Sequence, residues 1–191
     1  MDLSALSATP PRVLARRSQR LGIFTVEELD LDFGAAGQAT YERLRGGPGA
    51  VMALPYDGTH FYLVSEYACG FERFELGLVK GKIDAGESPQ QACLRELSEE
   101  IGLTAGKLTP LKSEMTVAPG LMSLKMFPFL CTDLSYRHLD SGDELLPPQV
   151  IKVTPKEAQE LIFDPHSPLQ ESRTIACLCL GLRAALADRG G

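Results

Sequence analysis

Residues 81–103 read GKIDAGESPQQACLRELSEEIGL, and this stretch decides the interpretation of the fold. Ser88 is a good helix N-cap, Pro89 suits the first helical position, and a glutamine three residues after the serine completes a capping box. Gly102 is a natural stop just past a helix. The pattern therefore predicts a helix of about thirteen residues over 89–101.

Three glutamates gather on one face of this predicted helix. Glu96, Glu99 and Glu100 are related by steps of three and four residues, so their carboxylates are neighbours. Like charges at this spacing destabilise a helix, and a divalent cation reverses that effect. Oxygen ligands without Cys or His favour magnesium or manganese over zinc. The apolar residues spaced for burial are expected on another face: Leu94, Leu97 and Ile101.

Arg95 is the cation placed to organise these acids. It lies four residues before Glu99, and we expect it also to reach Glu87. An arginine can fork across a carboxylate, which fixes the geometry of both groups. The alternative, an ordinary solvated acidic face, is disfavoured by the many fixed positions around a capped helix.

The complete pattern resembles the Nudix box, the signature of Nudix hydrolases. It contains a glycine, then a glutamate after five residues, and finally the run REL-x-EE-x-GL. The resemblance implies that Glu96 and Glu100 are the main ligands of Mg²⁺, or of Mn²⁺, and that Glu99 assists. The carbonyl of Lys80 is expected to add a ligand, and Gly81 lets the backbone approach the bound group closely.

The resemblance also implies catalytic and structural roles around the box. Glu100, Glu99 and Arg95 belong to the expected catalytic set. Glu144, on a polar loop, is the first candidate for the general base and Glu99 the second, while a plain exposed loop acid is the alternative for Glu144. Glu87 and Gly102 are expected to be structural.

Further stretches resemble the ADP-ribose pyrophosphatase group, and within it the hydrolases of ADP compounds. The similarity covers roughly residues 20–185. These stretches are 41–45, 64–68, 74–77, 80–87 and 142–144. The implied reaction is Mg²⁺-dependent hydrolysis of the diphosphate of ADP-ribose, NADH or diadenosine polyphosphates to AMP and a phosphorylated remainder. The alternatives are a hydrolase of nucleotide sugars and a non-catalytic nucleotide-sensing module.

Substrate contacts are expected outside the box. Tyr41 and Arg43 are candidates for contacts to adenine and phosphate, or else ordinary edge-strand residues. Glu75 is a candidate for a ribose or outer metal contact, with a structural ion pair as the alternative. Pro119 lies close to the place of a proline associated with ADP-ribose hydrolases. Ser65 stands where the group often has an arginine.

Composition excludes several classes of protein. The 191 residues include 44% hydrophobic ones and carry a formal net charge of −6, which favours a globular domain and disfavours nucleic-acid binding. Five cysteines without a CxxC pair disfavour a zinc ribbon and a disulfide framework. With no expected signal peptide or membrane span, a cytoplasmic location is the default expectation.

The expected fold class is α/β, with a mixed sheet in a Nudix α/β/α sandwich and an N-terminal β-hairpin extension. Residues 1–46 would form an arm and a hairpin of strands at 24–33 and 38–44, used for dimerisation and substrate contact. Residues 47–191 would form the Nudix hydrolase domain. Strands at 50–54 and 61–66 are predicted to pair as a second hairpin. Relatives form homodimers, so a homodimer is expected.

Overall fold

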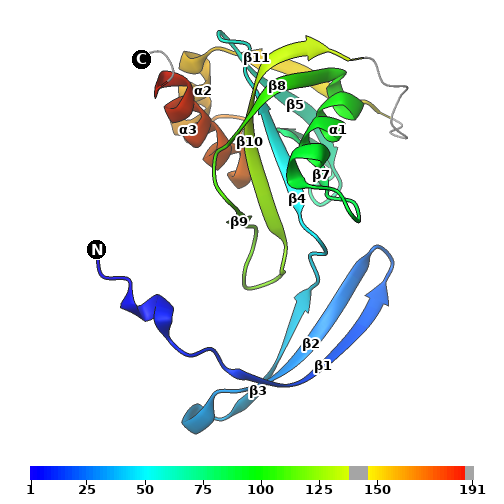
Figure 1. Cartoon of the computed structure of the whole chain (residues 1–191), viewed down its shortest axis with the longest axis vertical. Helices are drawn as coiled ribbons and strands as arrows, with labels where there is room; N and C mark the ends of the chain where they lie inside the picture. The colour runs from blue at the N-terminus through cyan, green and yellow to red at the C-terminus, as the bar shows by residue number, and fades with distance from the viewer. Residues whose placement is uncertain (138–145, 188–191) are drawn as a thin grey trace. The chain divides into compact units, whose positions relative to one another are not determined.

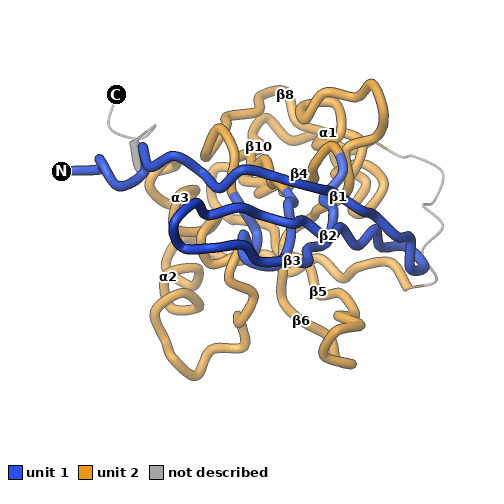
Figure 2. Tube along the Cα trace, turned by 90° about the horizontal axis from the view of Figure 1, so that it is seen from below, with its two compact units in different colours: residues 1–47, 116–124 blue, residues 48–115, 125–191 orange. Residues whose placement is uncertain are grey.

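A computed structural model describes residues 1–137 and 146–187 of the chain (Figure 1). The chain divides into two compact units, coloured separately in Figure 2. The first contains Met1–Gly47 and Thr116–Leu124, and the second contains Pro48–Met115 and Lys125–Gly191. The helix that carries the glutamates belongs to the second unit.

The first unit is built on a three-stranded antiparallel sheet in the order β1-β2-β3. Its strands are β1 (Arg12–Leu21), β2 (Phe24–Asp32) and β3 (Gln38–Leu44), with short 3-10 turns at Ser4–Ser7 and Gly34–Ala36. The predicted pairing of the second and third strands is confirmed. The extension is nevertheless larger than a hairpin, because β1 pairs along the whole of β2. Strand β1 has no recognisable sequence signal, since its residues are almost all exposed and lack an alternating apolar pattern.

The second unit contains two sheets. The larger has the order β7-β4-β10-β8, with β9 also pairing with β10, and the smaller has the order β11-β5-β6. The larger sheet is mixed, because β4 runs parallel to β10 and antiparallel to β7. Its strands are β4 (Ala50–Pro55), β7 (Val79–Lys82), β8 (Leu103–Pro110), β9 (Met115–Thr116) and β10 (Lys125–Tyr136). Those of the smaller sheet are β5 (Phe61–Ala68), β6 (Arg73–Gly77) and β11 (Gln149–Val153).

The predicted hairpin between β4 and β5 is wrong. The two strands belong to different sheets, and an isolated bridge joins Phe61 only to Tyr56, the residue after β4. Every residue of β4 is buried, which suits a central strand with neighbours on both sides better than one arm of a hairpin. The turn at Asp57 and Gly58 therefore passes the chain from one sheet to the other.

Helices cover both faces of the larger sheet, as the α/β/α prediction requires (Figure 1). Helix α1 (Pro89–Ile101) packs against β4, β7 and β8. Helix α3 (Ser172–Ala187) packs against β4 and β10, and α2 (Pro155–Phe163) packs against α3 and β11. No helix within the described ranges is long and apolar enough to cross a membrane.

Helix α1 has the predicted bounds and both predicted caps. Ser88 and Gln91 form the reciprocal capping box, and Gly102 ends the helix in the left-handed conformation at φ 66°. The predicted buried stripe is shifted, however. Leu97 is buried as expected, whereas the other buried positions are small residues: Ala92, Cys93 and Ser98. With this face of the helix turned toward the sheet, Glu96 and Glu100 lie beside β7.

Candidate active site

The centre of the site is the contact between Glu96 on α1 and Gly81 on β7. A Cβ atom at position 81 would overlap all three atoms of the Glu96 carboxyl group. Gly81 is not at a positive φ, so the close approach itself, and not backbone conformation, requires glycine here. The helix can therefore lay a carboxylate directly on the strand.

Glu100 lies one turn further along the helix and faces the same strand. The backbone N–H of Lys80 donates a hydrogen bond of 3.2 Å to its Oε1. Its Oε2 is buried and has no hydrogen-bond partner among the residues that the structure describes. Burial, with smaller contributions from the nearby Glu66 and Glu96 carboxylates, raises the pKa of Glu100 to about 8 against the opposing effect of Lys80. A buried carboxyl group with an unpartnered oxygen is a candidate ligand for a cation.

Glu96 lies in the same environment, but its pKa is raised less. Burial also raises the pKa of Glu96, while Arg95 opposes the shift with a hydrogen bond of 2.8 Å from Nη1 to Oε1. Its side chain is 14% exposed, compared with 36% for Glu99. The three glutamates are therefore not equivalent: two face the strand, and Glu99 lies at the solvent edge.

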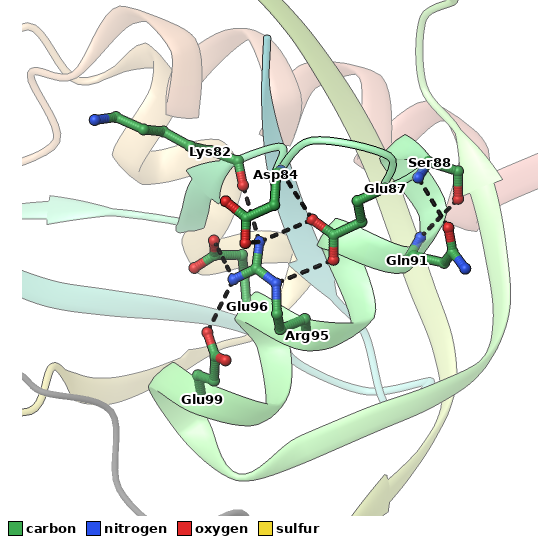
Figure 3. Close-up of polar contacts among 8 residues, drawn as sticks. All are labelled: Lys82, Asp84, Glu87, Ser88, Gln91, Arg95, Glu96 and Glu99. Carbon is green, nitrogen blue, oxygen red and sulfur yellow. Dashed lines mark hydrogen bonds and ion pairs between the residues drawn. The ribbon is translucent and has the colours of Figure 1, made fainter. Parts of the chain in front are cut away.

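Arg95 organises the acids, as Figure 3 shows. Its Nε and Nη2 donate to the two oxygens of Glu87 at 3.0 Å each, and its Nη1 donates to Glu99 at 3.0 Å. Nη2 also donates to the carbonyl of Lys82 at 2.9 Å, which ties the helix to the end of β7. The contacts expected with Glu87 and Glu99 are thus present. Arg95 lowers the pKa of Glu87, which keeps that carboxylate charged.

The donor set fits a divalent cation. Within the described ranges, no three His, Cys, Asp or Glu side chains already converge as a metal site. The strand backbone can supply a further oxygen ligand in place of a third side chain, because Glu96 and Glu100 both lie against the backbone of Lys80 and Gly81. The unpartnered oxygen of Glu100 and the raised pKa values of both acids are what a hard cation would relieve.

The other candidate residues belong to other elements of the chain. Tyr41 and Arg43 lie on β3 of the first unit, where Arg43 pairs with the buried Glu27 at 2.8 Å. Pro119 also belongs to the first unit. Glu75 accepts a hydrogen bond of 2.7 Å from Arg73. Glu144 lies outside the described residues.

Sequence reasoning missed a cavity of about 450 Å³ in the second unit. Three charged pairs line it: Lys80 with Glu66, Arg73 with Glu75, and Arg173 with Glu171. Gln170 also lies in the wall and accepts a hydrogen bond of 2.6 Å from Arg73, across 97 positions of sequence. No local motif signals this last contact, because only the packing of β6 beside the segment before α3 creates it.

Comparisons with known proteins agree with this geometry. The model of the NUDIX domain family matches residues 47–174. The chain is 40% identical over 162 residues to the ADP compounds hydrolase NudE of Escherichia coli strain K12, covering 84% of this chain and 85% of that protein. It is 34% identical over 142 residues to the ADP-ribose pyrophosphatase of Bacillus subtilis strain 168, covering 72% and 73% respectively.

The fold comparison gives the same result. A crystal structure of an ADP compounds hydrolase superposes with a TM-score of 0.85 at 38% identity, covering 95% of this chain and 97% of the other. The resemblance to the ADP-ribose pyrophosphatase group and the predicted Nudix fold are both confirmed. The chain belongs to the Nudix family, whose domain spans the glutamate helix and its strand.

Proposed function

We propose that this protein hydrolyses the diphosphate of ADP-linked compounds to AMP and a phosphorylated remainder. One observation carries the proposal: Glu96 and Glu100 lie against the Lys80–Gly81 backbone, and the buried Oε2 of Glu100 has no hydrogen-bond partner among the described residues. That arrangement occurs in a chain that is 40% identical to an ADP compounds hydrolase over most of its length. Buried carboxylates are normally paired or coordinate a metal, so this placement favours a metal-dependent activity.

The expected cofactor is Mg²⁺, with Mn²⁺ as a substitute. Glu96, Glu100 and the carbonyl of Lys80 would hold it, and Glu99 would assist from the solvent edge. A bound divalent cation neutralises diphosphate charge and lowers the pKa of a water ligand. Arg95 acts through the carboxylates as a positioning residue, because it fixes Glu96 and Glu99 at once.

The general base is proposed to be Glu144, with Glu99 as the second candidate. Glu99 has the exposure to reach a water molecule, but its carboxylate is already engaged in a hydrogen bond from Arg95. Tyr41, Arg43 and Pro119 are proposed to contact the substrate from the first unit, and Glu75 from the second.

A homodimer is proposed because the sheet of the first unit lacks a core of its own. Among its strand residues only Glu27 and Leu29 are buried. Several large apolar side chains on or beside its strands are exposed: Val13, Leu14, Leu21, Ile23, Phe24, Phe33 and Tyr41. A three-stranded sheet needs a covered apolar face to be stable, and a second copy would supply it. Light scattering at micromolar concentration should give the mass of a dimer, and a monomeric mass would contradict this assignment.

The test of the reaction is AMP release from four substrates, each with Mg²⁺ and with a chelator. ADP-ribose, NADH and diadenosine triphosphate represent ADP compounds, and ADP-glucose represents nucleotide sugars. Metal-dependent AMP from the first three supports the proposal, and their relative rates identify the preferred compound. Preference for ADP-glucose would favour a nucleotide-sugar hydrolase. Tight nucleotide binding without turnover would favour a sensing module.

A further inference from the structure

Lys80 connects the acidic cluster with the neighbouring cavity. Its backbone N–H donates to Glu100, on the side of the proposed metal ligands. Its side chain lines the cavity of about 450 Å³ and ends in an ion pair with Glu66 on β5. The backbone and side chain of one residue therefore face two adjoining parts of the same unit.

Three cations line this cavity, and they differ in how firmly they are held. Arg73 donates both to Glu75 and to Gln170. Arg173 pairs with Glu171, whose carboxylate is itself fixed by the N–H and hydroxyl of Thr174 at 2.8 Å each. Within the described residues, Lys80 has Glu66 as its single ion-pair partner. A compact ammonium on a flexible stem can exchange such a partner more readily than a forked guanidinium can.

The negative charge around Lys80 favours a change of ion-pair partner when an anionic substrate binds. Glu66, Glu96 and Glu100 place three carboxylates around the Lys80 segment, and the substrate adds the negative charge of a diphosphate. The Lys80–Glu66 pair is partly open to solvent, with side chains 22% and 34% exposed, so an arriving anion can reach it. A diphosphate presents more charge and more acceptor oxygens than one carboxylate does.

Resting on the proposed function, we infer that the Lys80 ammonium leaves Glu66 to bind a non-bridging oxygen of the substrate diphosphate. Glu66 holds the ammonium in the cavity until substrate arrives. Lys80 then serves the site twice, through its backbone beside the metal ligands and through its side chain on the substrate. The phosphorylated remainder would extend from there toward the cavity.

The experiment is calorimetric titration of α,β-methylene ADP in the presence of Mg²⁺. This analogue carries a diphosphate that cannot be hydrolysed at its bridging position, so the result does not depend on turnover. Lys80→Gln keeps the backbone contact to Glu100 and removes the ammonium, and Lys80→Arg keeps the charge. Glu66→Gln removes the resting partner. Lys156→Gln, on α2 with a side chain 86% exposed, controls for the loss of one positive charge.

The expected pattern separates substrate binding from a purely structural ion pair. Lys80→Gln should bind about tenfold more weakly or worse, Lys80→Arg within about threefold of the natural protein, and Glu66→Gln as tightly or more tightly. Lys156→Gln should not change the affinity. If Lys80→Gln and Glu66→Gln weaken binding equally, the pair is structural and the inference is wrong. Unchanged affinity in Lys80→Gln, or no binding by the natural protein, also overturns it.

A second variant covers the case in which Lys80→Gln fails to fold because Glu66 is left unpaired. The double variant Lys80→Gln/Glu66→Gln removes both charges and should fold, yet still bind as weakly as expected for Lys80→Gln. Restored affinity in the double variant would overturn the inference. AMP release by the natural protein is measured separately, so a failure of the proposed reaction is distinguished from a failure at Lys80.

Discussion

The carboxyl group of Glu96 occupies the space that a side chain at position 81 would fill. Helix α1 and strand β7 therefore touch at these two residues. The position of Glu96 depends on the absence of a Cβ atom at position 81. The same approach brings Glu100 within hydrogen-bond distance of the Lys80 amide. The fixed number of residues between Gly81 and the glutamates therefore places the glutamates of the helix against the glycine of the strand.

Gly81→Ala should reduce AMP release at least about a hundredfold, because Glu96 must move by more than a bond length to admit the methyl group. Circular dichroism should show an intact fold, since a side chain can swing away where a backbone cannot. Gly70→Ala is a control for stability, because nothing lies within 4 Å of its added Cβ. Its thermal unfolding should match that of the natural protein. Full activity in Gly81→Ala would show that Glu96 does not need its present position.

Arg95→Lys should reduce both turnover and stability, although the charge is retained. A lysine cannot donate at once to Glu87, Glu99 and the Lys82 carbonyl as Arg95 does. The free energy of unfolding should fall by about 1–3 kcal/mol in urea titrations, and AMP release should fall about tenfold or more. Arg183→Lys, at an exposed position of α3, should change neither. An unaltered rate in Arg95→Lys would remove Arg95 from the positioning role.

Without metal, the protein should become less stable as the pH rises from about 5 to 8. Burial raises the pKa of Glu100 from 4.5 to about 8, so the folded state binds a proton that the unfolded state has released. The protonated Glu100 contributes fully to the free energy of unfolding below pH 4.5. This contribution is lost as the pH rises to the folded pKa of about 8, at up to roughly 1.4 kcal/mol per pH unit between these two pKa values. Glu96 shifts in the same direction.

Mg²⁺ should flatten this pH dependence, because it binds the deprotonated carboxylate and stabilises the folded state most at high pH. Urea titrations at several pH values, with chelator and with Mg²⁺, measure the effect. Glu100→Gln should flatten the chelator curve as well. A natural protein whose metal-free stability rises over this range would contradict the account of Glu100 as a buried acid that lacks its cation.

Two of the five cysteines should react quickly with a thiol reagent in the folded protein. Cys69 and Cys179 are exposed, whereas the other three are buried: Cys93, Cys131 and Cys177. Burial raises the pKa of the Cys177 thiol to about 12, which suppresses its thiolate further. A colorimetric titration should therefore count two thiols before unfolding and five after it. Fast reaction of a third thiol would show that the core around α1 or α3 opens readily.

Helix α1 could be predicted almost to the residue because its information is local. A capping box at Ser88 and a left-handed stop at Gly102 fix both ends without reference to the rest of the chain. The contacts of Arg95 were predictable for the same reason, since Glu87 and Glu99 are its neighbours in sequence. The glutamate face followed from helical spacing alone.

The errors arose where tertiary contacts decide the structure. The sequence between β4 and β5 has the turn residues of a hairpin, but β4 is buried along its whole length and pairs instead with β7 and β10. The Arg-rich strand β1 was missed because exposure on both faces removes the apolar alternation. The pair of Lys80 with Glu66 joins different sheets, so no spacing along the chain indicates it.

The most direct measurement is the rate of AMP release from ADP-ribose by Glu100→Gln at saturating Mg²⁺, beside the natural protein with Mg²⁺ and with chelator. Glutamine keeps the shape and can still accept the hydrogen bond from the Lys80 amide, but it removes the buried charge that is proposed to hold the metal. The account predicts that Glu100→Gln folds normally and loses at least about a thousandfold in rate, as the chelator does to the natural protein. A rate close to that of the natural protein with Mg²⁺ would contradict the assignment of Glu100 as a metal ligand and, with it, the proposed site.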